Sequence, residues 1–272
     1  MARYIYLISG LPEISTESAR LLPKLLEEWE EELKKEDLED LRFLIFRNDN
    51  KNLLKFLRAK DGISLLDRVS MHEPCVFSFV EIENIYIEEY DGEKKVPEYW
   101  LFFLEEEKKK KLSLQERERL LVELYYEAGI SHRNPLVRKI FLFKRDMKNL
   151  LLAINAYRHN LRLENIVVGN YDLPEILLRS QESYKGLAKD FPFLSLWEKL
   201  LDEKRLVELE QEIDLVLVEY IDSVRNPDNF SFDYLIRYYI DLAQRYRWLE
   251  LSPRVGKIAL EELTEHILQK AL

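Results

Sequence analysis

Glycine and proline are scarce in this chain, with 7 and 9 copies among 272 residues. A β architecture of many short strands needs such residues at its turns, so their scarcity argues against that class of fold. Apolar residues make up 47% of the chain and charged residues 34%. This balance supplies a core, excludes wholesale disorder and is typical of amphipathic helices. The expected fold class is therefore mainly all-α.

Cysteine, positive charge and long apolar runs are also lacking. Cys75 is the single cysteine, so the chain cannot form an internal disulfide, which suits a reducing compartment. The net charge of −10 argues against nucleic-acid binding, because phosphates require a basic face. No apolar run approaches the ~20 residues of a membrane helix, and no signal-peptide cleavage pattern is present. We expect a cytoplasmic protein that does not insert into a membrane.

What the chain has instead is an internal repeat. Residues 46–54, FRNDNKNLL, return as residues 143–151, FKRDMKNLL. The match continues more weakly, with Leu57 against Ile154. The shared pattern is too long and too polar to be a chance overlap of two apolar stripes. Duplicated helical units bury their faces against one another, so the repeat favours a scaffold over a single-pocket enzyme.

The polar positions that the two copies of the repeat share suggest a structural role. On a helix, the apolar residues of each copy gather on one side, with Asp49 and Asn52, or Asp146 and Asn149, at its edge. A carboxylate and an amide one turn apart can hold a neighbouring helix or loop by hydrogen bonds. We predict that they fix helix register in two equivalent units. A catalytic or metal site is the alternative, but no His or Cys lies near either copy.

Capping and breaking residues divide the chain into helices. The first copy is expected on a helix from near Asp37 to Asp61-Gly62, and the second on a helix from Asn134-Pro135 to about His159. A capping box at Ser113 begins another helix, which Gly129 is expected to end. Further helices are expected over residues 22–33, from 173, and over 196–223, 230–248 and 255–268.

Two segments are open to a β interpretation. Residues 4–8 could form a short strand or a buried extended segment. Residues 82–103 hold two β-prone runs on either side of Asp91-Gly92, which is a hairpin signal. A helix interrupted by a surface loop explains the same residues equally well, so the sequence leaves both alternatives open.

The repeat also predicts two domains. An N-terminal lobe of residues 1–110 would hold the first copy, and a C-terminal lobe of residues 111–272 the second. The charged run at residues 105–111 would lie between them. The duplicated units would then pack as a two-lobed or funnel-like helical scaffold.

No motif in the sequence supports a phosphate-binding loop, a metal site or a catalytic dyad. The pair Gly256-Lys257 lacks the upstream glycine and the following Ser or Thr of a phosphate loop. His72 and Cys75 have no second ligand pair at metal spacing. Acids are abundant, but 51 of them in a helical protein will form chance pairs, so none is singled out as a catalytic dyad. We therefore expect no catalytic residue, metal or cofactor.

An aromatic cluster near the C-terminus is a candidate for partner binding. Most of it is expected to belong to the core. Any exposed part would combine Tyr, Trp and Arg, the residue types that dominate interface hot spots. The candidates are Tyr238, Tyr239, Arg245, Arg247 and Trp248.

The second copy lies in a longer stretch, from Tyr125-Tyr126-Glu127 through Asn134 to Arg158-His159. This stretch resembles the C-like subunit family of V/A-type rotary ATPases, which is related to vacuolar subunit d. It is most similar to a bacterial branch encoded alongside such ATPases, as are residues 4–12 and 232–256. In that family an acid is followed by an Asn-Leu pair and then an Arg. The matching positions are Asn52, Leu53 and Arg58, and Asn149, Leu150 and Arg158.

The resemblance implies an all-helical adaptor in a central rotor. One end would grip the rotating shaft and the other would rest on the membrane proteolipid ring, without bond chemistry. The protein would then be peripheral on the cytoplasmic side of the membrane, held there through its partners. Family members have three such units, whereas only two copies are clear here; a third around Asp241 and Gln244 does not exceed chance. A generic helical-repeat scaffold with unrelated partners is the alternative function, and an enzyme with an unrecognised site is a third.

Overall fold

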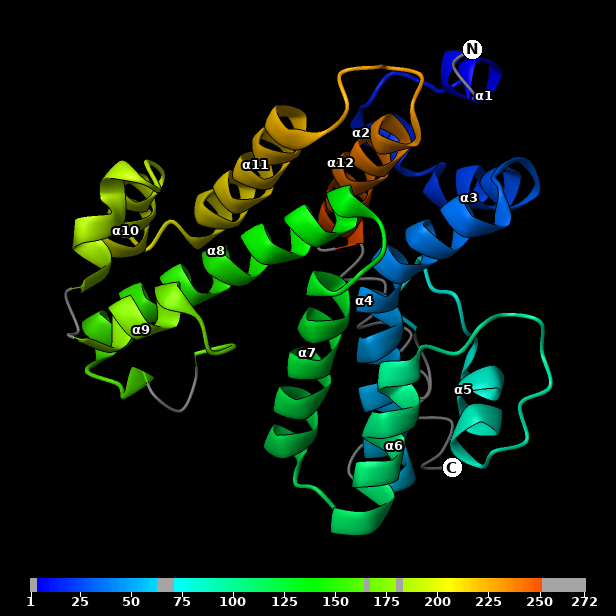
Figure 1. The fold of residues 1–272 in the computed structure, drawn as a ribbon, viewed down its shortest axis with the longest axis horizontal. Helices are drawn as coiled ribbons and strands as arrows, with labels where there is room; N and C mark the ends of the chain where they lie inside the picture. Colours follow the sequence, from blue (N-terminus) through cyan, green and yellow to red (C-terminus); the bar gives the residue numbers. More distant parts are fainter. Residues whose placement is uncertain (1–3, 63–70, 164–166, 180–182, 251–272) are drawn as a thin grey trace, which may run out of the picture. The chain divides into compact units, whose positions relative to one another are not determined.

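The computed structural model describes residues 4–62, 71–163, 167–179 and 183–250. Every regular element in these ranges is a helix, and none of them contains a strand (Figure 1). The expected all-α fold is therefore confirmed. None of the helices in the described ranges is both long enough and apolar enough to cross a lipid bilayer.

The chain forms two compact units. Unit 1 comprises residues 1–121 and 226–272, and unit 2 comprises residues 122–225. This division differs from the expected lobes, 1–110 and 111–272, because the chain returns to the first unit after unit 2. Helix α12 (Phe232–Glu250) packs there on α2 (Thr16–Ala19) and α3 (Leu22–Glu32). Unit 1 is therefore built from both ends of the sequence.

Unit 1 is organised around the long helix that carries the first copy. Its described helices are α1 (Ile5–Ser9), α2, α3, α4 (Lys35–Lys60), α5 (Phe79–Tyr86), α6 (Glu98–Lys110), the first part of α7 (Leu114–Ile130), and α12. Rings of Phe46, Phe77 and Trp100 pack against one another in its core. The Tyr238 hydroxyl donates to the Pro12 carbonyl oxygen at 2.8 Å, which ties α12 to the start of the chain.

Unit 2 is organised around the helix of the second copy. It contains the rest of α7, α8 (Pro135–His159), α9 (Asp172–Arg179), the 3-10 helix η3 (Ser183–Lys189), α10 (Leu194–Asp202) and α11 (Leu206–Val224). Helix α8 contacts α9, η3 and α11. The Phe143 and Tyr220 rings stack with centroids 3.8 Å apart, which fixes α11 on α8. Trp197 and Phe141 are fully buried.

The ends of the two long helices follow the predicted capping chemistry. Helix α4 ends before Asp61, and Gly62 adopts φ +74°, the left-handed conformation that glycine allows. Before α8, the Asn134 side chain accepts hydrogen bonds from the backbone N–H groups of Leu136 and Val137. Both helices therefore begin and end within about two residues of the prediction.

Both β alternatives were wrong. Residues 82–103 fall in α5 and α6, with Asp91-Gly92 in the irregular segment between them. The capping box of Ser78 and Glu81 satisfies the first backbone donors of α5 and starts a helix where the alternation suggested a strand. Residues 5–9 form α1, because the described residues offer no strand with which an extended segment could pair.

Two helix ends also differ from the prediction. Gly129 lies inside α7, which continues to Ile130. Its missing side chain makes room for the Phe141 ring, which lies where a Cβ atom would stand. The helix predicted over residues 196–223 is two helices, α10 and α11, separated by a turn in which Lys204 has φ +58°. The helix predicted over 255–268, with Gly256, lies outside the described residues.

Candidate functional site

The first candidate site is the buried polar edge of α4 in unit 1. Asn52 is fully buried and uses both ends of its amide on one residue. Its Nδ2 donates to the His72 carbonyl oxygen at 3.1 Å, and its Oδ1 accepts from the His72 N–H at 2.7 Å. The side chain thus satisfies both backbone groups of a residue 20 positions ahead. We call this two-bond arrangement the Asn clamp.

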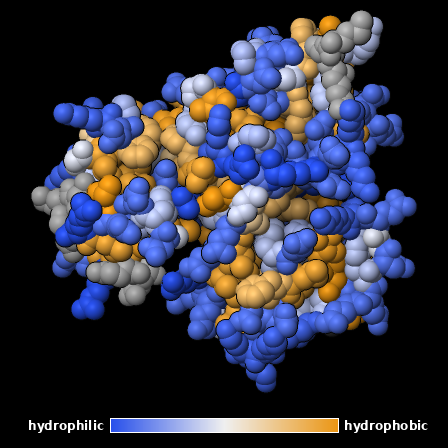
Figure 2. Space-filling model, viewed as in Figure 1, coloured by the Kyte–Doolittle hydropathy of each residue, from blue (hydrophilic) through white to orange (hydrophobic). Residues whose placement is uncertain are grey.

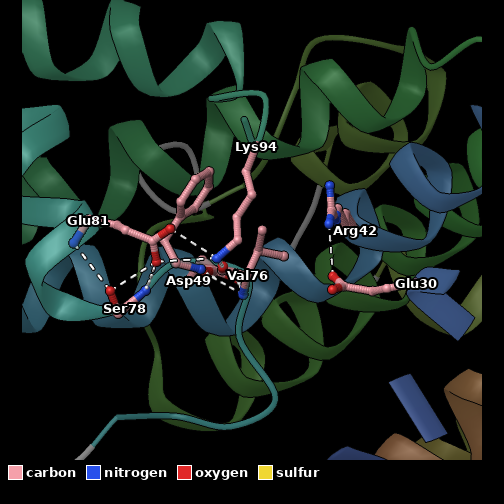
Figure 3. A network of polar contacts seen from close by, with 8 residues as sticks. Glu30, Arg42, Asp49, Val76, Ser78, Glu81 and Lys94 are labelled. Carbon is pink, nitrogen blue, oxygen red and sulfur yellow. Dashed lines mark hydrogen bonds and ion pairs between the residues drawn. The ribbon is translucent and has the colours of Figure 1, made fainter. Parts of the chain in front are cut away.

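One turn earlier, Asp49 holds the same segment. Its carboxylate accepts hydrogen bonds from the Val76 N–H at 2.9 and 3.0 Å and from the Phe77 N–H at 2.8 Å (Figure 3). Asn48 donates to the Glu73 and Pro74 carbonyl oxygens at 3.1 and 3.0 Å. Neighbouring polar residues of α4 therefore fix residues 72–77 against the helix.

The environment of Asp49 determines its protonation. Burial raises the pKa of its carboxyl to about 7, although the N–H donors of Phe77 and Val76 oppose the shift. The nearby Glu73 carboxylate raises this pKa further. The Lys94 ammonium lies close by, where it donates to the Val76 carbonyl oxygen at 2.8 Å and pairs with Glu81 at 2.9 Å (Figure 3).

The second copy contains the same Asn clamp in unit 2. Asn149 is fully buried on α8. Its Nδ2 donates to the Val168 carbonyl oxygen at 2.9 Å, and its Oδ1 accepts from the Val168 N–H at 2.8 Å. The clamped residue lies 19 positions ahead, close to the spacing in the first copy. In both units a short helix, α5 or α9, follows the clamped residue.

The acid of the second copy binds a side chain instead of the backbone. Asp146 accepts a hydrogen bond from the Tyr171 hydroxyl at 2.6 Å. The Arg145 guanidinium stacks on the Tyr171 ring at 3.4 Å from its centroid. Burial raises the pKa of Asp146, and burial together with the hydrogen bond to Asp146 raises the pKa of Tyr171. The carboxylate again holds the segment after the clamp, through a different donor.

Among the remaining repeat positions, the leucines of the two copies are buried alike, whereas the arginines lie in different environments. Leu53 and Leu150 are both fully buried. Arg158 pairs with Asp202 and donates to the Leu201 carbonyl oxygen at 2.9 Å, so it satisfies an acceptor at the end of α10. Arg58 is half-buried in the last turn of α4. The two copies therefore share one device, although its stabilising effect stays a prediction.

The residues considered for partner binding lie in different environments. Tyr238 and Tyr239 are buried in the core of unit 1, so they do not form a surface patch. Arg245 is exposed and pairs with Asp241 at 2.9 Å. Arg247 and Trp248 are half-buried, with the guanidinium 5.3 Å from the ring centroid.

The possible third copy, on α12, cannot be compared in full with the other two. Asp241 binds Arg237 and Arg245 of its own helix. The segment in which a clamped residue would fall, 19 to 20 positions after Gln244, lies outside the described residues. The comparison therefore rests on two copies.

Some residues of the site escaped the sequence analysis. The Asn50 Oδ1 atom accepts from the Tyr99 hydroxyl at 2.9 Å and from the Trp100 indole at 2.6 Å, which fixes α6 on α4. The corresponding residue of the second copy is Met147, so a comparison of the two copies does not mark Asn50 as a shared polar position. The available signal was a polar residue at a buried helical position. Tyr171 gave no signal, since nothing in the sequence pairs it with Asp146.

The arrangement holds chain segments by hydrogen bonds. Within the described ranges, no group of three or more His, Cys, Asp or Glu side chains could hold a metal ion. Burial, with the neighbouring Glu73 and Asp49 carboxylates, raises the pKa of the Cys75 thiol, so this residue is protonated at neutral pH. The polar edges of α4 and α8 thus bind groups of their own chain, which are backbone amides in both units and also the Tyr171 hydroxyl in unit 2.

A family model described as "Protein of unknown function (DUF2764)" matches residues 1–270. The chain belongs to this family. No curated protein and no solved structure matches it. Because the match covers both units, both Asn clamps lie within the region that defines the DUF2764 family.

Proposed function

We propose that the protein is a non-catalytic adaptor in the central stalk of a bacterial V/A-type ATP synthase. It would couple the rotor shaft to the membrane proteolipid ring, and it would reach the cytoplasmic face of the membrane only through these partners. The observation that carries the proposal is the pair of Asn clamps on two long helices, Asn52 on α4 and Asn149 on α8. The family resemblance of the same motif supplies the rotary context.

A coupling piece must resist bending and sliding of its helices. Helix α4 has 26 residues and α8 has 25, so each is about 38 Å long. Each holds a following segment by hydrogen bonds to fully buried side chains. Removing one partner of such a bond leaves a buried polar group unsatisfied, so small displacements are strongly opposed. Stiffness of this kind suits transmission of torque.

The charge of the protein supports a role in assembly. A net charge of −10 favours encounter with basic partner surfaces. Complementary charge raises association rates and suppresses wrong partners more than it sets affinity. An acidic adaptor would therefore assemble with basic shaft or ring subunits.

Purification from native membranes tests the proposal. An affinity tag on this chain should recover shaft and ring subunits of the rotary ATPase in stoichiometric amounts. A tagged cytoplasmic protein of similar negative charge controls for non-specific attraction. An intact ATPase isolated from the same cells without this chain would contradict the proposal.

A helical-repeat scaffold with unrelated partners is the second candidate. Exposed apolar side chains on helices of both units favour it, such as Phe102 on α6 and Leu215 on α11, because such side chains suit protein contacts of any kind. The same purification distinguishes the two functions. Stoichiometric partners other than ATPase subunits would support the scaffold and exclude the stalk.

A further inference from the structure

A groove between α10 and α11 in unit 2 combines exposed leucines with negative charge. Its cavity volume is about 350 Å³. Leu200, which is buried, lies among its lining residues, together with Leu196 and Leu215, which are 40% and 51% exposed. Figure 2 shows apolar surface among hydrophilic side chains in the region where Figure 1 places these helices. Exposed leucines at a concave site favour protein contacts.

The spacing of the lining residues fits a helical occupant. Leu196 and Leu200 lie one turn apart on α10, and Glu208, Glu212 and Leu215 lie along one side of α11. From residue 208 to residue 215 the α11 wall is about 10 Å long. An amphipathic helix presents its anchors at i, i+3 or i+4, and i+7 over the same length. The two walls are helices, so they offer no strand edge to an extended peptide.

The charge of the groove selects a basic occupant. Of the acidic residues of α11, Glu208 and Glu212 line the groove, and α11 contains no Lys or Arg. The basic side chains of the lining are already paired, Arg205 with Glu203 and Glu208, and Lys199 with Glu203 at 3.9 Å. Glu212 is half-buried and has no ion-pair partner among the described residues. The uncompensated charge at the groove is therefore negative.

We infer that the α10–α11 groove is a docking site for a basic amphipathic helix of a partner protein. Its leucines would fill the apolar part of the groove, and a Lys or Arg would pair with Glu212. A second copy of this chain fits less well, since each copy carries a net charge of −10. The inference follows from α10 and α11 alone and does not depend on the rotary assignment.

Site-specific cross-linking in native cells identifies the occupant. A photoreactive amino acid replaces Gln211, which lines the groove, and in a control replaces Leu178, which is 41% exposed on α9 of the same unit. The expected product joins position 211, and not position 178, to a partner segment with apolar residues at i, i+4 and i+7 and with Lys or Arg between them. Products on an acidic segment, an extended segment or a second copy would overturn the inference. Equal labelling from both positions, or no product from position 211, would do the same.

Binding of a defined probe tests the chemistry. The probe is a labelled helical peptide of about 18 residues made of Leu and Lys, and a Leu-Glu peptide of the same pattern is its counterpart. The full-length chain should bind the Lys peptide and not the Glu peptide. Leu215→Ser should weaken binding about tenfold, and Glu212→Gln about threefold with a smaller dependence on salt.

A matched variant keeps this test specific. Leu178→Ser removes an exposed leucine outside the groove and should change the probe affinity less than about twofold. Circular dichroism establishes that each variant remains folded. Equal weakening by Leu178→Ser and Leu215→Ser, or no effect of either groove substitution, would refute the groove as the binding site.

Discussion

At the scale of single residues, the main finding is that two asparagines perform one task in two places. An asparagine amide has both donors and acceptors, so it can satisfy the N–H and the C=O of one backbone residue together. Asn52 does this for His72, and Asn149 does it for Val168. Neither Asp nor Leu offers this combination. This two-bond pairing explains why both copies carry Asn at this position, which an apolar residue could not replace.

Replacing either clamp should destabilise the protein. Asn149→Leu removes the Asn partners of the buried Val168 N–H and C=O, and Asn52→Leu removes those of the half-buried His72, so each should lower the free energy of unfolding by about 1–3 kcal/mol. Asn155→Leu is the control, because the Asn155 amide binds only the Leu151 carbonyl oxygen of its own helix. Urea denaturation measures all three. Neutral results at both clamps would disprove their stabilising role.

The buried Asp49 should make stability depend on pH. Its pKa is raised from 3.8 to about 7 in the folded protein, so folding favours the protonated form. A group of this kind contributes stability that is fully present below about pH 4 and is lost as pH rises through about 7. The free energy of unfolding should therefore fall between about pH 5 and pH 8, by up to a few kcal/mol.

Substitution isolates the contribution of Asp49. In Asp49→Asn the carboxyl that titrates is gone, so the fall in unfolding free energy between about pH 5 and pH 8 should largely disappear. The exposed Asp172→Asn in α9 is the control and should keep the parental dependence. Urea titrations at both pH values provide the measurement. A variant Asp49→Asn with the full parental dependence would show that other groups cause it.

At the scale of helices, capping residues and periodicity predicted most of the elements. Asn134-Pro135 and Asp61-Gly62 placed the ends of the long helices correctly, because caps act within one turn. Asp91-Gly92 suggested a β-hairpin that is not present in residues 82–103, because a turn signal does not reveal whether helices or strands flank it. Gly129 was wrongly predicted to end a helix for a different reason. A residue without a Cβ is needed there to make room for the Phe141 ring, a contact that local sequence does not show.

Gly129 therefore offers a test at this scale. Helix propensity alone predicts that Gly129→Ala gains about 1 kcal/mol of stability. The overlap of the new Cβ with the Phe141 ring predicts a net loss of about 1–3 kcal/mol. Gly186→Ala is the control, since nothing lies within 4 Å of its Cβ position. Thermal unfolding of Gly129→Ala, alone and with Phe141→Leu, should show the loss and its partial recovery; a stabilised Gly129→Ala would contradict the packing argument.

At the scale of the whole molecule, helix α12 completes the first unit. Helix α12 packs on α2 and α3, and Tyr238 binds Pro12 across 226 positions of sequence. The Tyr238 ring lies 6.1 Å from the Trp29 ring, and both are buried. Unit 1 therefore depends on contacts between segments that lie far apart in the sequence.

Shortening the Tyr238 side chain should show how far unit 1 depends on α12. Tyr238→Ala leaves a cavity beside Trp29 and should lower the free energy of unfolding by about 3–5 kcal/mol, whereas Tyr238→Phe loses one hydrogen bond and should cost about 1 kcal/mol. Tyr6→Ala is the control, since this side chain is 92% exposed. Tryptophan fluorescence during urea denaturation reports the transition. Equal stability of Tyr238→Ala and Tyr6→Ala would show that α12 contributes little to unit 1.

The sequence by itself determined the helical class, both long helices and the polar positions that the two copies share. These features depend on composition, periodicity and capping, which act between residues a few positions apart. Only the tertiary structure decided what each polar residue binds, where Tyr238 and Tyr239 are buried, and how α12 returns to the first unit. Those outcomes depend on contacts between residues 19 to 226 positions apart, which local patterns do not encode.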